Sequence, residues 1–339
     1  MNPNERFIYI DRLKGVAIVL VVIGHIIQFN TVESSQNVLF GIIYSFHMPL
    51  FMFISGYLAQ KTVKDSIYNN YLLFLKKKAQ SLLIPYFVWS LVVDKLFFVE
   101  EIHYSLKDPI TLIKNGSGLW FLLYLFLLYL TYSAFFYVSI KINKRIYVLV
   151  DILIICLLLL CFVLVKKMQL VSYIDSLTLY FLFFFSGVII SKYQKIKNVM
   201  LEKYTFSIFL TVFLILSIHY KFTDTSLFNK LIKLIVAYSA IMALYYITIK
   251  ISWNAFVDRC ISYCGRNSLI IYATHFRLAK LVSGLFLLPH LDVVPLVCIS
   301  LFASIIIICI SFGIAKVVEL SPLLNFLLYG KSERNFLIK

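Results

Sequence analysis

Long runs of apolar residues, each about the length of a membrane-spanning helix, recur from one end of this chain to the other. A helix needs about 20 mostly apolar residues to cross the hydrocarbon core of a bilayer. Hydrophobic residues make up 61% of the chain and charged residues 14%, whereas soluble domains have about half and about a quarter. Such a chain cannot fold as a large soluble domain, and we predict an all-α integral membrane protein.

The apolar runs predict a bundle of about ten transmembrane helices. They lie at residues 15–32, 39–59, 82–99, 119–139, 146–165, 174–191, 205–220, 231–249, 268–288 and 293–316. No charged or Pro/Gly-rich linker and no internal repeat divides the sequence. Residues 1–339 are therefore expected to form a single transmembrane domain.

Lysine and arginine fall mainly on alternate connections between the predicted helices. This pattern indicates the orientation, because short cytoplasmic loops carry the excess of these residues. The rich connections are 6–14, 61–78, 141–145, 192–203, 250–266 and 331–339. The opposite connections hold only Lys107, Lys114, Lys166, Lys167, Lys221 and Lys230. Both termini are expected in the cytoplasm. Topology and attraction to anionic lipid then explain the net charge of +16, and no nucleic-acid partner is inferred.

Two further patterns carry little functional weight. The first apolar run lacks a small-residue cleavage site and ends at Gln28 and Asn30, so it is interpreted as a retained helix. Cys260 and Cys264 are four residues apart, but no second pair or nearby histidine completes a metal site. Neither a disulfide nor a metal is inferred.

The first span carries Asp11, Lys14 and His25. Ionisable side chains inside a membrane span are costly and are functional candidates by default. Lys14 and His25 are eleven residues apart, which returns almost to the same azimuth after a rise of roughly 16 Å. They are expected to share one helix face, with Lys14 at the cytoplasmic rim and His25 well inside. In the alternative interpretation, Lys14 is only a positive-inside anchor and His25 bonds a neighbouring carbonyl.

The second span carries His47, Pro49 and Ser55. Counted from the outer ends of the first two spans, His25 lies about 10 Å deep and His47 about 12 Å deep. The two histidines are expected to meet. Pro49 removes a helical hydrogen bond and is expected to open the backbone near them, with a simple packing kink as the alternative.

The ninth and fourth spans hold the remaining candidates. Tyr272 and His275 are three residues apart and share a helix face, while Arg277 and Lys280 place positive charge inside a span. Trp120 lies at the start of the fourth span. A tryptophan at this place is consistent with a role in binding and equally with an interfacial aromatic belt.

Together these stretches resemble the membrane-bound acyltransferase-3 family, whose members O-acylate carbohydrates and other surface molecules. The resemblance covers nearly the whole chain and rests on six fragments in order. They are the Asp-x-x-Lys-Gly opening at Asp11 with His25, the run 46–57, Ile84-Pro85-Tyr86, Leu119-Trp120-Phe121, the segment 265–275 and Ser321-Pro322-Leu323-Leu324. Lys14 stands where the family more often has Arg, and so lacks the rigid bidentate fork of a guanidinium. We also expect a stand-alone member, because no appended hydrolase-like domain follows the last helix.

The resemblance implies transfer of an acetyl or other short acyl group from cytoplasmic acetyl-CoA to a hydroxyl of a cell-surface or lipid-linked saccharide. Lys14, with Arg277 or Lys280, would hold the phosphate-bearing donor. His25 would be the general base, kept neutral by desolvation. The other expected donor- or acceptor-binding residues are Asp11, His47, Ser55, Trp120, Tyr272 and His275. Acetyl-CoA is expected as a substrate with no permanently bound cofactor, in a multi-pass protein of the bacterial inner membrane.

A transporter or flippase of a lipid-linked glycan is the alternative function, because such proteins also combine many helices with intramembrane charge. The sequence does not show the matching pair of interrupted helices in two halves that would favour it. A membrane scaffold whose histidines only pack is the other alternative. Release of free coenzyme A from acetyl-CoA by the purified protein would distinguish an enzyme from both.

Overall fold

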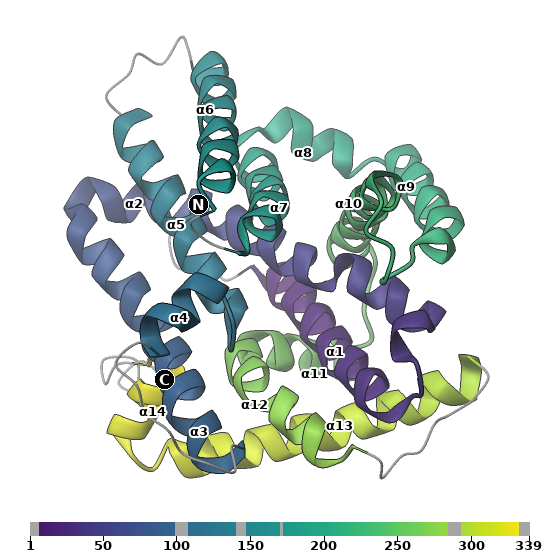
Figure 1. Cartoon of the computed structure of the whole chain (residues 1–339). Helices are drawn as coiled ribbons and strands as arrows, with labels where there is room; N and C mark the ends of the chain where they lie inside the picture. Colours follow the sequence, from purple (N-terminus) through teal and green to yellow (C-terminus); the bar gives the residue numbers. More distant parts are fainter. Residues whose placement is uncertain (1–6, 99–107, 140–146, 170–171, 284–292, 332–339) are drawn as a thin grey trace. The chain divides into compact units, whose positions relative to one another are not determined.

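The computed structural model describes residues 7–98, 108–139, 147–169, 172–283 and 293–331, and every regular element in these ranges is helical (Figure 1). The chain divides into two compact units. Unit 1 comprises Met1–Ile54 and Ile189–Val317, and unit 2 comprises Ser55–Val188 and Val318–Lys339. The all-α prediction is confirmed for the described residues.

Unit 1 is built around its first helix. Its helices are α1 (Ile8–Asn30), the start of α2 (Val38–Phe87), the end of α7 (Ile174–Lys192), α8 (Gln194–Met200), α9 (Lys203–Leu216), α10 (Leu227–Lys250), α11 (Ala255–Arg266), α12 (Ser268–Leu281) and most of α13 (Val293–Val318). α1 packs against α10, α11 and α12. Buried residues occur on every side of α1, which is the pattern of a helix enclosed by others.

Side chains complete the ends of these helices. The last carbonyls and first amides of a helix have no partner within it, and hydrocarbon offers no water to satisfy them. At the end of α1, Asn30 Nδ2 donates to the carbonyl oxygen of Ile26 at 2.9 Å. At the start of α10, the Ser226 hydroxyl accepts the backbone N–H of Asn229 at 3.2 Å. Polar residues at the borders of the apolar runs therefore mark where the helices begin and end.

Two glycines bring α1 and α11 into backbone contact. A Cβ atom on Gly15 would lie 2.0 Å from the carbonyl oxygen of Ile261. A Cβ atom on Gly265 would lie 1.9 Å from the carbonyl oxygen of Asp11. Both glycines belong to fragments that carry the family resemblance. Their conformation is ordinary, and what they supply is the missing side chain that permits this close approach.

Unit 2 contains the remaining helices. They are the rest of α2, a π-helical segment (Val88–Val93), α3 (Asp94–Phe98), α4 (Asp108–Asn115), α5 (Trp120–Ser139), α6 (Tyr147–Lys167), most of α7 and α14 (Pro322–Tyr329). The π-helical segment is tied to α14 by Trp89, whose indole N–H donates to the carbonyl oxygen of Leu328 at 2.8 Å. α14 starts at the Ser321-Pro322 fragment, where the serine hydroxyl accepts the N–H of Leu324. That fragment is therefore a helix-capping sequence.

Four described helices are long and apolar enough to cross a membrane: Val38–Thr62 within α2, α7, α10 and Val294–Val318 within α13. Two bent pairs also qualify if each pair is one span, α4 with Trp120–Ser133 and α8 with Lys203–His219. The chain is therefore a multi-pass membrane protein. The count of ten spans is not confirmed, and the cytoplasmic location of both termini stays a prediction.

Most helices follow the predicted runs, with four differences. The predicted runs 39–59 and 82–99 and the connection between them form one continuous helical stretch, from α2 through the π-helical segment into α3. α2 continues through Pro49 without a break, so the opened backbone expected there is wrong. A single missing N–H is tolerated within this long helix. The predicted run 268–288 gives a helix that ends at Leu281, and residues 284–292 lie outside the described part of the chain. α11, which precedes it, is a separate amphipathic helix that hydropathy alone did not identify.

Candidate active site

His25 lies on α1 in unit 1 and is held by two polar side chains. Its Nδ1 atom is 2.7 Å from Gln28 Oε1, and the hydroxyl of Tyr44 is 3.1 Å from the same nitrogen. The Tyr44 hydroxyl also donates to Gln28 Oε1 at 2.9 Å. An amide oxygen only accepts hydrogen bonds, so Nδ1 carries the proton in this arrangement. The Nε2 atom of His25 then keeps its lone pair and can accept a proton.

His47 and His275 are fixed in the same tautomer by backbone carbonyls. His47 Nδ1 donates to the carbonyl oxygen of Ile43 at 2.7 Å. His275 Nδ1 lies 2.9 Å from the carbonyl oxygens of both Ile271 and Tyr272. His275 Nε2 is buried and has no hydrogen-bond partner among the described residues. All three histidines thus present an unprotonated Nε2.

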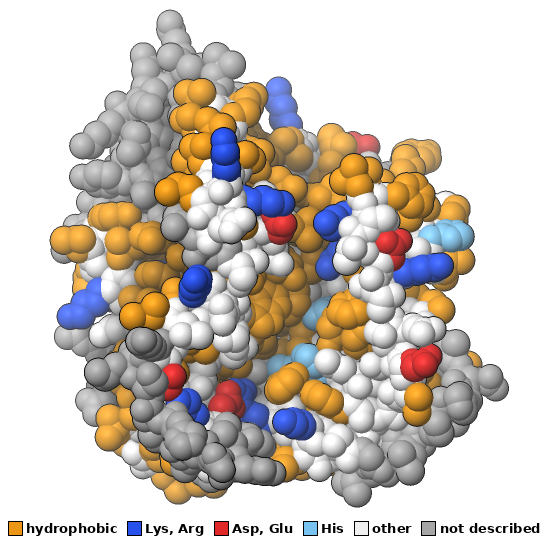
Figure 2. Space-filling view, viewed as in Figure 1, with side chains coloured by type: hydrophobic (Ala, Val, Ile, Leu, Met, Phe, Trp, Pro, Cys, Tyr) orange, Lys and Arg blue, Asp and Glu red, His pale blue; other side chains and the backbone are white. Residues whose placement is uncertain are grey.

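The three histidines come from three different helices and gather within one part of unit 1. The His25 and His275 rings are 5.1 Å apart between centroids, and Tyr44 lies beside His47 at 4.8 Å. Phe276 packs edge-on against His25 at 5.0 Å. The expectation that His25 and His47 meet is consistent with this geometry, since Tyr44 contacts both. His25 is only partly buried, whereas His47 and His275 are buried. On the face drawn in Figure 2, the histidine side chains that can be seen lie next to hydrophobic ones.

The predicted cations occupy different positions relative to the histidines. Lys14 is partly buried on α1, Arg277 is buried on α12, and Lys280 is exposed. Arg277 Nη1 donates to the carbonyl oxygen of Ala273 at 2.6 Å. Gly265, which precedes α12, lies against Asp11 near the start of α1, whereas His275 lies against His25 near its end.

α1 and α12 therefore run in the same direction. Arg277 follows His275 by two residues, and its guanidinium turns back along α12 to the carbonyl oxygen of Ala273. The expectation that Arg277 or Lys280 helps Lys14 to hold the donor stays a prediction. Asp11 is buried in the first turn of α1, and Tyr272 is partly buried with its ring 5.8 Å from that of His275.

Ser55 and Trp120 belong to unit 2. The Ser55 carbonyl oxygen accepts a hydrogen bond from the Tyr129 hydroxyl at 3.4 Å. Trp120 stacks on Tyr180 with ring centroids 5.4 Å apart. The predicted role of Ser55 and Trp120 in donor or acceptor binding stays a prediction.

Sequence reasoning missed Gln28 and Tyr44 as parts of the site. Their spacing could have identified them. Gln28 lies three residues after His25 and Tyr44 three residues before His47, so each shares a helix face with its histidine. It also left Lys233 without a role. Lys233 lies on α10, and its ammonium is 5.8 Å from the ring centroid of Tyr220.

Comparison with known proteins adds to this geometry. The model of a family described as an acyltransferase domain matches residues 7–316. Nodulation protein NolL of Sinorhizobium fredii is 34% identical over 144 residues, which are 40% of this chain and 38% of that protein. Nodulation protein NolL of Mesorhizobium japonicum is 33% identical over 96 residues, 27% of this chain and 25% of that protein. The matches thus span well under half of each relative, and no solved structure matches the chain.

Proposed function

The chain belongs to this family of acyltransferase domains, and from that premise we propose that it O-acylates a saccharide with an acetyl or other short acyl group from acetyl-CoA. The acceptor is a hydroxyl of a cell-surface or lipid-linked glycan, and the enzyme works in the bacterial inner membrane. Acetyl-CoA is consumed as a substrate. The family match supports the acyl transfer, and the chemistry of the histidine site supports the mechanism.

The observation that carries the mechanism is the hydrogen bonding of His25. Gln28 Oε1 holds Nδ1 at 2.7 Å, which orients the ring and leaves Nε2 as the basic nitrogen. A general base needs its tautomer and direction set in advance, as the second hydrogen bond of a catalytic imidazole does. His47 and His275 have their Nδ1 atoms tied to the main chain, which suits them to support the site.

His25 Nε2 takes the proton of the acceptor hydroxyl while the hydroxyl oxygen attacks the carbonyl carbon of the thioester. The carbon–sulfur bond breaks as the new ester forms. The departing thiolate takes the proton from the His25 imidazolium and leaves as free coenzyme A. The histidine ends in its starting tautomer.

Side chains on α1 and α12 are the proposed binding groups for the donor and the acceptor. Lys14 precedes His25 by about three helical turns, where a cation would bind phosphates of the donor. The buried Arg277 and the exposed Lys280 of α12 would assist Lys14 at the donor, and Tyr272 beside His275 would contact the acceptor.

Two measurements on detergent-purified protein test the proposal. Free thiol released from acetyl-CoA and labelled acetyl appearing on extracted surface glycan should rise together with enzyme concentration. Heat-unfolded protein and protein lacking the His25 imidazole serve as controls. Folded wild-type protein that consumes no thioester, yet moves a lipid-linked glycan across vesicles, would overturn the proposal in favour of a flippase.

A further inference from the structure

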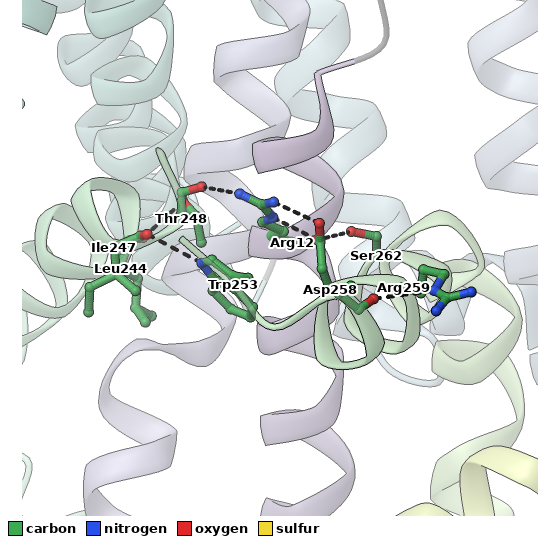
Figure 3. Close-up of polar contacts among 9 residues, drawn as sticks. Arg12, Leu244, Ile247, Thr248, Trp253, Asp258, Arg259 and Ser262 are labelled. Atoms are coloured by element: carbon green, nitrogen blue, oxygen red, sulfur yellow. Dashed lines mark hydrogen bonds and ion pairs between the residues drawn. The ribbon is translucent and has the colours of Figure 1, made fainter. Parts of the chain in front are cut away.

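Arg12 holds the start of α1 to two other helices of unit 1 through contacts that the proposed chemistry does not use (Figure 3). Its Nε and Nη2 atoms donate to the two carboxylate oxygens of Asp258 on α11, each at 2.7 Å. Its Nη1 atom donates to the carbonyl oxygen of Thr248 on α10 at 2.9 Å. One guanidinium therefore ties α1, α10 and α11 together.

The surroundings of this ion pair fix its geometry. The Ser262 hydroxyl donates to Asp258 Oδ1 at 3.1 Å, and the Trp253 ring lies 5.5 Å from Arg12 Cζ (Figure 3). The side chains of Arg12 and Asp258 are 18% and 26% exposed, whereas those of the Lys166–Asp175 pair in unit 2 are 61% and 66% exposed. A bidentate pair that is mostly shielded from water holds its orientation far better than an exposed pair.

The helical repeat links this pair to the site. Residues advance by about 100° around an α-helix, so Lys14 lies about 200° from Arg12 and His25 about 220° from it. Once Arg12 is fixed toward α10 and α11, Lys14 and His25 must both face the opposite side. The missing side chain of Gly15 lets α1 lie in close backbone contact with α11 at Ile261. Together the ion pair and the glycine contact set both the rotation and the position of α1.

We propose that Arg12 and Asp258 are positioning residues that fix the rotation of α1 and thereby aim Lys14 at the donor and His25 at the reacting hydroxyl. This inference rests on the proposed function of the same site. Neither residue touches a substrate. Their effect reaches the chemistry through the rigid α1, because a misplacement of about 1 Å at a reacting group can cost about a hundredfold in rate.

A double-mutant cycle in the full-length protein tests the pair. Asp258→Asn keeps the shape of the side chain and removes its charge, and Arg12→Gln removes the guanidinium. Each should lower kcat/KM for acetyl-CoA about 10- to 100-fold per folded molecule, through a higher KM from Lys14 and a lower kcat from His25. The double variant should be no worse than the single ones, because the pair acts as a unit. Arg12→Lys, which keeps the charge without the fork, should fall between them.

The exposed pair of unit 2 provides the matched control. Lys166→Gln and Asp175→Asn remove an ion pair within unit 2, and should leave kcat and KM unchanged. All assays are run well below the unfolding temperature of each variant. If Asp258→Asn and Arg12→Gln lower only the unfolding temperature and keep normal kcat and KM, the pair merely stabilises the fold and the inference is overturned.

Hydrogen exchange supplies a measurement that does not need enzyme activity. Amides between Lys14 and His25 should exchange faster in Asp258→Asn than in wild type, and equally fast in the double variant and in Asp258→Asn. Unchanged exchange in Asp258→Asn would refute the positioning role even if activity fell. A wild-type protein that consumes no acetyl-CoA would refute the proposed function, while the exchange result still decides whether the pair holds α1.

Discussion

Among single residues, the structure separates the proposed roles of His25 and Lys14 by position along α1. His25→Ala should lower kcat by about 10² to 10⁴, the usual loss for a general base, while the protein binds acetyl-CoA with near-normal affinity. Lys14→Ala should weaken donor binding. Lys14→Arg should be tolerated because the charge is kept and the related family commonly has Arg at this position. Calorimetric titration with acetyl-CoA, beside an acetylation assay, measures both quantities.

Each variant must first be shown to be folded and inserted. Unchanged acetylation by His25→Ala would refute the mechanism. Unchanged donor affinity in Lys14→Ala would leave that lysine as a positive-inside anchor.

Gln28 provides a second prediction, because it is the acceptor that sets the His25 tautomer. In Gln28→Leu the remaining polar neighbour of Nδ1 is Tyr44, whose hydroxyl can donate to that nitrogen. The proton then moves to Nε2, which can no longer accept one. The hydrogen bond to Gln28 favours the tautomer with the proton on Nδ1 by about 1 kcal/mol. Its loss should lower kcat roughly fivefold to tenfold with little change in donor KM.

Gln28→Glu keeps an acceptor facing Nδ1 and is the matched control. Tyr44→Phe should also be mild, since Gln28 still holds the ring. Equal rates for Gln28→Leu and Gln28→Glu would show that the amide does not control the tautomer.

Among the helices, the packing of α1 on α11 depends on Gly15. Gly15→Ala would place a Cβ atom 2.0 Å from the Ile261 carbonyl oxygen, and backbone cannot yield as a flexible side chain does. We expect destabilisation of about 1–3 kcal/mol or more, the usual cost of overpacking, together with reduced activity. Thermal unfolding in detergent measures the loss.

Gly313 on α13 is the matched control, because a Cβ atom there would meet nothing within 4 Å. Gly313→Ala should be neutral or stabilising by about 0.5–1 kcal/mol, as alanine favours a helix interior. If the two variants unfold at the same temperature, the close α1–α11 contact does not form as described.

The stability that the Arg12–Asp258 pair contributes at the junction of α1 with α11 should also depend on pH. Hydrogen bonds from Arg12 hold the pKa of the Asp258 carboxyl below its ordinary value of 3.8. A depressed carboxyl pKa contributes stability that is fully present above the unfolded value and is lost as pH falls through the folded value. The stability difference between wild type and Asp258→Asn should therefore be constant from pH 7 to about pH 5 and shrink below about pH 4.

Unfolding temperatures of both proteins, measured across this range in one detergent, test the dependence. Because the asparagine variant cannot titrate at this position, it isolates the contribution of one carboxyl from all others. A difference that stays constant to the lowest pH would mean that Asp258 is not paired with Arg12.

For the whole molecule, the distribution of lysine and arginine predicts cytoplasmic termini. A reporter active only in the periplasm should be silent when fused after Lys339 and active when fused near residue 109. Dual reporters of opposite compartment preference, fused at both positions, provide the control for expression. Activity of the periplasmic reporter at the C-terminus would mean an odd number of spans, and the depth comparison of His25 with His47 would fail with it.

Sequence alone determined the helical class, the multi-pass character and most helix positions. The physical reason is that hydrocarbon imposes a local requirement: each crossing segment must satisfy its own backbone and be apolar over about 20 residues. The same rule singled out His25, His47 and His275, since ionisable groups inside apolar runs are conspicuous. The structure gathers all three in unit 1.

The tertiary structure decided which residues act together. Gln28 and Tyr44 are unremarkable as an amide and a phenol until the fold brings both to one nitrogen of His25. In the sequence, Arg12 is one of the basic residues of the connection 6–14. The structure shows that its carboxylate partner, Asp258, lies 246 residues further along the chain. His275 lies 250 residues after His25 in the sequence, and only the packing of α12 on α1 brings their rings to 5.1 Å. Hydropathy and helical spacing report what surrounds a residue within a few turns, whereas these pairings depend on how distant helices pack, which local pattern does not contain.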